Sequence, residues 1–150
     1  MQKEQILQEI NDLFGKLSVS VSNIEVQKQG DIDVYNIITP DSGMMIGRGG
    51  EHLQAFNYLV SLMLSHKAGD RVRLNIDINN YRQNEMDELM VSVRKTADDV
   101  LKSKVSQELQ PMTSYERLVV HNLLTDDIQI ETESVGEGKE RRITIKYIEL

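Results

Sequence analysis

The chain contains 150 residues, 39% hydrophobic and 27% charged, which is typical of a globular protein with one domain or two small ones. It has no cysteine, which excludes disulfides, thiol catalysis and cysteine-ligated zinc. It has no apolar run long enough to insert into a membrane and no secretory or transit signal, so we expect a cytoplasmic protein. The net charge of −7 disfavours a nucleic-acid partner, because lysine and arginine drive phosphate binding, but local fields can differ from the net charge.

The first half of the chain predicts six elements in the order helix, strand, strand, helix, helix, strand. Apolar residues recur at helical spacing in the longer helices and alternate along the strands. The elements are expected at residues 6–17, 24–26, 32–38, a short turn and a longer helix within 42–68, and 72–78. This order indicates an α+β domain, which we place at residues 1–80.

The second half predicts a long connecting helix, then another helix and a small antiparallel sheet. Thr113 and Glu116 form a capping-box pattern, in which each side chain satisfies an amide at the start of the second helix. The elements are expected at residues 81–104, 106–110 (extended), 113–125, 128–134 and 143–147. We therefore expect a second α+β domain at residues 81–150, connecting helix included, with a core and a sheet separate from those of the first.

A glycine cluster lies between the two helices of residues 42–68. Gly47, Gly49 and Gly50 surround Arg48 in the sequence Ile-Gly-Arg-Gly-Gly-Glu-His-Leu. Glycine lets the backbone turn sharply and approach a ligand closely, and the amides that begin the next helix attract anions. Such a loop can hold a phosphodiester backbone while Arg48 supplies charge. Alone, the pattern favours the simpler alternative, a turn that needs glycine only for its geometry.

The context of the cluster is more specific than the cluster itself. I-G-x-x-G-x-x-L between two helices, after a hairpin and before one alternating strand, resembles a KH domain in its bacterial, type II order. The resemblance covers residues 1–80 and implies a loop that clamps about four nucleotides of backbone. Gly49 departs from the family pattern, since many such loops carry a second basic residue there, and this argues against high affinity. Lys67, Arg71 and Arg73 are either further phosphate contacts or solvated surface residues.

Arg117 and His121 lie four residues apart on the capped helix, so their side chains share one face. Arginine offers a two-pronged donor for phosphate, and a protonated histidine can donate to the same anion. The spacing alone favours another interpretation, in which Arg117 pairs with an acid such as Asp127 and His121 packs as a boundary residue. No serine or cysteine partner for His121 and no metal-ligand spacing is present, so we expect neither a catalytic residue nor a metal site.

The segment around these residues resembles the R-three-H domain, which is named for its R-x-x-x-H signature and is associated with single-stranded nucleic acid. The matching residues are Met-Thr-Ser-Tyr-Glu-Arg-x-x-x-His, a following strand and the run Gly-Glu-Gly-Lys-Glu-Arg-Arg, which adds Arg141 and Arg142 as candidate contacts. A KH domain followed by an R-three-H domain resembles the Jag (SpoIIIJ-associated) family from end to end. Many members carry a further N-terminal domain, so we expect a short natural form or a trimmed chain.

The resemblance implies a non-catalytic protein that binds single-stranded RNA through the glycine loop and through a phosphate contact in the second domain. It further implies an RNA chaperone or post-transcriptional regulator linked to growth of the cell envelope. The expected partners are RNA and either another small KH protein or a second copy of this chain, without a cofactor or a small-molecule substrate. The alternative, favoured by the net acidity and by Gly49, is a protein-interaction adaptor with weak affinity for RNA.

Overall fold

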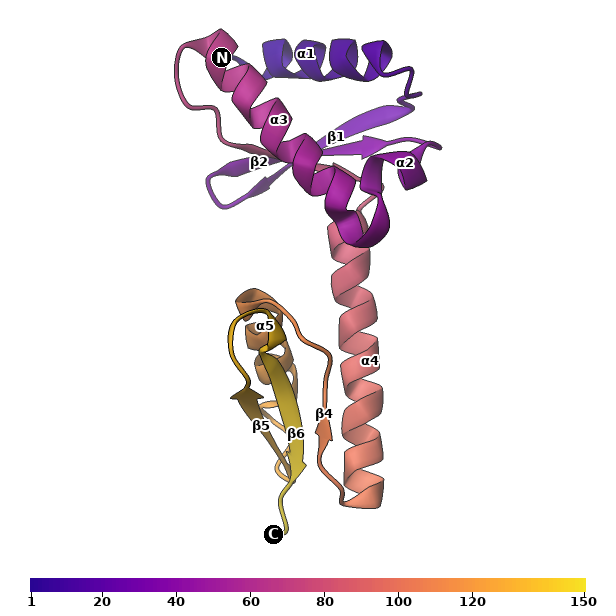
Figure 1. Ribbon diagram of the computed structural model, residues 1–150, viewed down its shortest axis with the longest axis vertical. Helices are drawn as coiled ribbons and strands as arrows, with labels where there is room; N and C mark the ends of the chain where they lie inside the picture. The colour runs from indigo at the N-terminus through magenta and orange to yellow at the C-terminus, as the bar shows by residue number, and fades with distance from the viewer. The chain divides into compact units, whose positions relative to one another are not determined.

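A computed structural model describes all 150 residues and divides the chain into two compact units, Met1–Arg82 and Gln83–Leu150. Each unit has its own buried apolar core and its own three-stranded sheet. Figure 1 shows the strands of the two sheets as separate groups. The predicted α+β class with two separate sheets is therefore confirmed. The boundary falls in the first turn of helix α4 (Tyr81–Ser103), which begins in the first unit and continues into the second.

The first unit has the element order predicted for a type II KH domain. Strands β1 and β2 form an antiparallel hairpin, whereas β3 pairs with β2 in parallel. The parallel pairing follows from the helical connection between them, which returns the chain to the end of the sheet where β2 began. The elements are α1 (Lys3–Lys16), β1 (Asn23–Gln29), β2 (Ile32–Ile38), α2 (Ser42–Ile46), the 3-10 turn η1 (Arg48–Gly50), α3 (Glu51–Ala68) and β3 (Leu74–Ile78).

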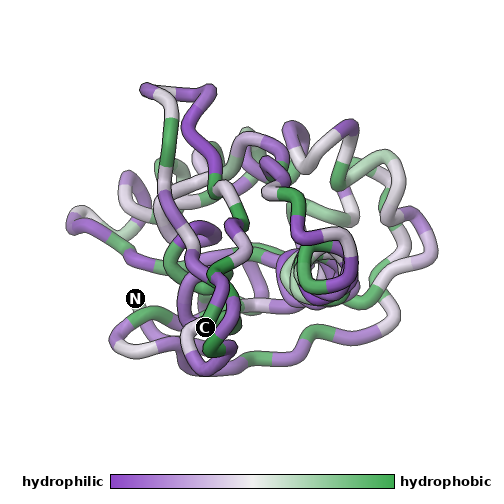
Figure 2. The backbone as a smooth tube through the Cα atoms, turned by 90° about the horizontal axis from the view of Figure 1, so that it is seen from below, coloured by the Kyte–Doolittle hydropathy of each residue, from purple (hydrophilic) through white to green (hydrophobic).

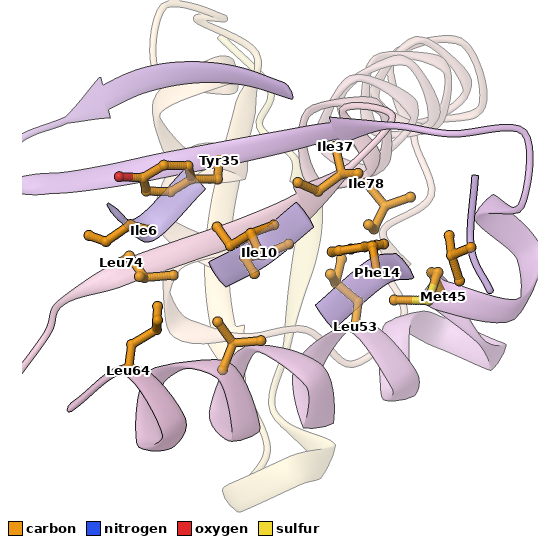
Figure 3. Close-up of a cluster of buried hydrophobic side chains, with 13 residues drawn as sticks. Ile6, Ile10, Phe14, Tyr35, Ile37, Met45, Leu53, Leu64, Leu74 and Ile78 are labelled. Carbon is orange, nitrogen blue, oxygen red and sulfur yellow. The ribbon is translucent and has the colours of Figure 1, made fainter. Parts of the chain in front are cut away.

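The core of the first unit is built from α1, α3 and the two strands β2 and β3 (Figure 3). Their apolar stripes face one another, which is the arrangement that buries most apolar area in a layered α+β domain. Tyr35 is fully buried and its hydroxyl has no hydrogen-bond partner. Burial, followed by the Asp33 and Glu4 carboxylates, raises the pKa of Tyr35. Because Leu53 of α3 is anchored in this core, the start of α3 and the glycine loop before it are held in place.

The second unit packs α4 and α5 against an antiparallel sheet with the strand order β4-β6-β5. Val93, Ala97 and Val100 are the buried residues of α4, at the spacing of a single helix face. Seen end-on in Figure 2, α4 carries both hydrophobic (green) and hydrophilic (purple) residues around its circumference. The remaining elements are β4 (Gln107–Glu108), α5 (Ser114–Leu124), β5 (Ile130–Val135), the 3-10 turn η2 (Gly138–Glu140) and β6 (Arg142–Tyr147).

Two strands begin two residues later than predicted. The strand expected from Ile128 begins at Ile130, because the Ile130 amide donates to the Asp127 carbonyl at 3.0 Å and closes a turn that leaves Ile128 75% exposed. The strand expected from Val72 begins at Leu74, because the Val72 amide donates to the Ser65 hydroxyl of α3 at 2.9 Å instead of to the sheet. None of the helices combines the length and the hydropathy that a membrane-spanning segment needs.

Candidate nucleic-acid interface

The glycine loop (residues 47–50) joins α2 to α3 through the single turn η1. Gly47, Gly49 and Gly50 have φ angles of +70°, +59° and +80°. Residues with a Cβ rarely adopt such angles, so the backbone itself requires glycine here. The predicted sharp turn between two helices is confirmed.

Two rings of the same unit lie against this loop. An ideal Cβ on Gly47 would lie 2.5 Å from Cγ of His52, and one on Gly50 would lie 3.0 Å from Cε1 of Tyr81. A Cβ on Gly49 would have no neighbour within 4 Å. The bare backbone is therefore open to a ligand at Gly49, whereas rings of the protein itself lie against Gly47 and Gly50.

Positive charge at the loop comes from Arg48 and from the start of α3. Arg48 is exposed and forms no ion pair. The N-cap residue of α3 is Gly50, which has no side chain to satisfy the first amides of the helix. The Glu51 amide donates to the Arg48 carbonyl, but the positive end of the α3 dipole still faces the loop and attracts an anion. The loop has the donors and the charge that a phosphate group requires.

A hollow of about 610 Å³ lies between α3 and the segment that leads into β3. Arg71 and Arg73 line it, and Tyr58 and Leu62 of α3 lie beside them with 69% and 56% exposure. An exposed aromatic next to arginines is a surface on which a base can stack. Sequence analysis missed Tyr58, because α3 is apolar on several faces and its spacing alone does not separate a core residue from an exposed one.

Lys67 was the third basic candidate of this unit, and the structure corrects its placement, because Lys67 lies among residues of α1 and not in this hollow. Its ammonium forms an ion pair with Glu9 of α1, so its charge is already compensated. The correction could not come from local sequence, because the two residues are 58 positions apart. Arg71 and Arg73 have no acidic partner and remain candidates.

The capping box predicted at the start of α5 is confirmed. The Glu116 amide donates to the Thr113 hydroxyl at 3.3 Å, and the Thr113 amide donates to the Glu116 carboxylate at 2.7 Å. The box fixes the first turn of α5 and therefore the direction in which the next residue, Arg117, leaves the helix.

Arg117 is half-buried and forms no ion pair, so the alternative in which it pairs with Asp127 is wrong. Its two terminal nitrogens donate to the Met112 carbonyl at 2.8 Å and the Ser114 hydroxyl at 3.1 Å. Asp127 pairs instead with Arg94 of α4 at 2.6 Å. The guanidinium charge of Arg117 is uncompensated as a result.

His121 and Arg141 lie on the same side of the second unit as Arg117. His121 Nδ1 is 2.6 Å from the Thr132 hydroxyl, and Arg141 Nε donates to the Ser134 hydroxyl at 2.9 Å. Thr132 and Ser134 are two residues apart on β5, so both point to one face of the sheet. The Met112 amide donates to the Arg141 carbonyl while the Met112 carbonyl accepts from Arg117, which brings the two arginines together.

Arg142 lies on the opposite face of the sheet, because neighbouring residues of a strand point to opposite sides. It pairs with Glu140 at 3.1 Å and with Glu108 at 3.7 Å. Lys146 shares this face, and its hydrogen bond and ion pair with Glu133 raise its pKa. The structure therefore separates Arg142 from the other three predicted residues of this unit, and its charge is compensated.

An open hollow of about 550 Å³ lies at the start of α5. It is lined by Arg117, by Lys139 of η2 and by Thr113 and Ser114 at the first turn of the helix. Lys139 forms no ion pair, and sequence analysis did not single it out. No group of three or more histidine, aspartate or glutamate side chains is placed to hold a metal ion anywhere in the structure.

The two units match known proteins in sequence. Residues 88–147 match the family model of the R-three-H domain. The chain is 31% identical over 142 residues to the RNA-binding protein KhpB of Clostridium symbiosum, which covers 94% of this chain and 63% of that protein. It is 34% identical over 128 residues to the RNA-binding protein KhpB of Bacillus subtilis strain 168, and this match covers 84% of this chain and 62% of that protein. The chain spans less than two thirds of these relatives, and it belongs to the Jag family, the family of the KhpB proteins.

Proposed function

We propose that this chain binds single-stranded RNA and holds it without catalysing a reaction. The observation that carries the proposal is the glycine loop, where open backbone at Gly49 adjoins the uncompensated Arg48 and the uncapped start of α3. The names of the KhpB relatives support RNA as the nucleic acid. A net charge of −7 does not oppose it, because basic residues without acidic partners gather at these sites.

In the first unit, the loop grips the phosphate backbone and the hollow beside α3 takes the bases. The positive end of the α3 dipole attracts one phosphate, and Arg48 pairs with it or with its neighbour. Tyr58 offers its exposed ring to a base, while Arg71 and Arg73 contact the phosphates that follow. The loop itself contacts no base edge, so base preference arises at the hollow.

In the second unit, Arg117, His121 and Arg141 form a phosphate-binding cluster. Arg117 and Arg141 keep donors beyond those used within the chain, since a guanidinium carries five N–H groups. The hydroxyls of Ser114, Thr132 and Ser134 hold the three side chains at their positions. Such a cluster adds affinity for any sequence, because phosphates carry no base identity.

The proposal extends to an RNA chaperone or post-transcriptional regulator in the cytoplasm, linked to envelope growth, whose second partner is another small KH protein or a second copy of the chain. The alternative is an adaptor that binds proteins and has little affinity for RNA. Gly49 favours the adaptor, because no second basic side chain supports Arg48 in the loop.

Substitutions at Gly49 test the loop directly, since this position has open space and a φ of +59° that asparagine and aspartate tolerate better than other residues. We expect Gly49→Asp to weaken binding of a single-stranded RNA about tenfold, Gly49→Asn to change it less than about threefold, and Gly49→Lys to tighten it. Asparagine and aspartate side chains have nearly the same shape, so the difference in affinity between the two variants isolates the effect of the charge. A tenfold difference in affinity corresponds to about 1.4 kcal/mol of binding free energy. Equal affinities for the Asp, Asn and Lys variants would place the RNA elsewhere.

A further inference from the structure

We propose that Tyr81 is a positioning residue of the glycine loop and that its ring holds Gly50 in the conformation that binds RNA. This proposal rests on the RNA-binding function proposed above. Tyr81 is the first residue of α4 and is 31 positions after Gly50, outside the glycine motif. It is half-buried at the edge of the first core.

The turn before Tyr81 is formed by Asn79 and Asn80, and hydrogen bonds to Thr39 and Asn36 hold it in place. Asn79 and Asn80 have positive φ angles of +49° and +54°, which turn the chain sharply out of β3. The Asn79 side chain donates to the Thr39 carbonyl at 2.8 Å and accepts from the Thr39 amide at 3.0 Å, as a neighbouring strand would. The Asn80 amide donates to the side chain of the buried Asn36 at 2.9 Å. These hydrogen bonds therefore fix the backbone just before Tyr81, whose ring lies against Gly50.

A second ring supports the loop at its other end. His52 Nδ1 lies 2.8 Å from the Met44 carbonyl, and because a carbonyl only accepts, Nδ1 must carry the proton. The ring thereby ties the first turn of α3 to the end of α2 and lies over Gly47. The two rings occupy the sides of Gly47 and Gly50 where other residues carry a Cβ, and they leave Gly49 open.

The physical need for such support comes from glycine itself. A segment with three glycines in four residues has many more accessible conformations than a segment whose residues all carry a Cβ, and only a fraction of them form the binding conformation. The apparent dissociation constant is the intrinsic one divided by the fraction of molecules in the binding conformation. If loss of a ring lowers that fraction to about a tenth, the apparent dissociation constant rises about tenfold.

The test compares Tyr81→Ala with Tyr81→Phe in the full chain, using a single-stranded oligonucleotide RNA at several salt concentrations. We expect Tyr81→Ala to raise the dissociation constant about tenfold without changing the salt slope, since the bound state keeps its phosphate contacts. Tyr81→Phe keeps the ring and should retain the parent affinity. A Phe variant as weak as the Ala variant, or an Ala variant with a lower slope, would overturn the positioning role.

A control and a second measurement separate this proposal from general destabilisation and from the proposed function. Leu7→Ala removes another half-buried side chain from the same core and should lower the melting temperature without weakening binding by the folded protein. Backbone order parameters of residues 47–51 in the free protein should fall in Tyr81→Ala and stay unchanged in Tyr81→Phe and Leu7→Ala. An ordered loop in Tyr81→Ala contradicts the proposal whether or not the parent binds RNA, whereas a parent without RNA affinity contradicts the proposed function alone.

Discussion

Replacement of both Gly47 and Gly50 by aspartate should weaken RNA binding by at least a hundredfold. Each carboxylate near a phosphate costs roughly 1–4 kcal/mol at a partly solvated surface, and 1.4 kcal/mol corresponds to tenfold in affinity. The new Cβ atoms would also meet the rings of His52 and Tyr81, and both positions have positive φ. The loop must therefore rearrange, and the melting temperature should fall. RNA affinity and melting temperature of the same variant measure the two effects.

The matched control is the double variant Gly15→Asp and Gly30→Asp. It adds the same two charges at exposed positions outside the loop, where a Cβ would have no neighbour within 4 Å. We expect this variant to keep its affinity within about threefold, because it leaves the three loop glycines unchanged and adds its charges at other exposed positions, where salt screens them. Equal losses in the two double variants would mean that net charge, not the loop, controls binding.

Replacement of Arg117 by alanine should weaken RNA binding about tenfold for all sequences alike and lower the salt slope by about one unit. The same change removes the donor to the Met112 carbonyl, which should cost about 1 kcal/mol of stability. That is less than the loss of a buried ion pair, because Arg117 has no acidic partner and is only half-buried. Melting temperature and affinity, measured on one preparation, separate the two roles.

Arg142→Ala is the control for Arg117→Ala, because it removes the same charge from the same unit, on the face of the sheet opposite to Thr132 and Ser134. Its partners Glu108 and Glu140 already compensate that charge, so its RNA affinity and salt slope should stay close to those of the parent. If Arg117→Ala loses stability while the folded fraction keeps its affinity, Arg117 is part of the scaffold only. The R-x-x-x-H pair would then not be a binding site in this chain.

The order of elements could be predicted because each has a local signature. Alternation over β3, helical spacing in α4 and the Thr113–Glu116 box are all properties of a few neighbouring residues. The strand starts at Leu74 and Ile130 were missed because a side chain or a turn competes for the first amide, which periodicity does not register.

The partners of the candidate site residues could not be predicted, because they depend on contacts between distant parts of the chain. Asp127 lies ten residues from Arg117 but pairs with Arg94, 33 positions away. Tyr81 lies beside Gly50 only because the turn at Asn79 and Asn80 places it there. Alternation places Arg141 and Arg142 on opposite faces, but which of them shares a face with Ser134 depends on the register of β6 against β5, which sequence alone does not give.

A titration of the unmodified chain with single-stranded RNA at increasing salt tests the central claim most directly. Five arginines without acidic partners face the two sites: Arg48, Arg71, Arg73, Arg117 and Arg141. If three to five of them neutralise phosphates, the plot of log association constant against log salt should have a slope of roughly −2 to −3.5. We predict that the chain binds the RNA at low salt and that the affinity falls with added salt along a slope in that range. An absence of binding even at low salt, or a slope near zero, would contradict the account and favour a protein-binding adaptor.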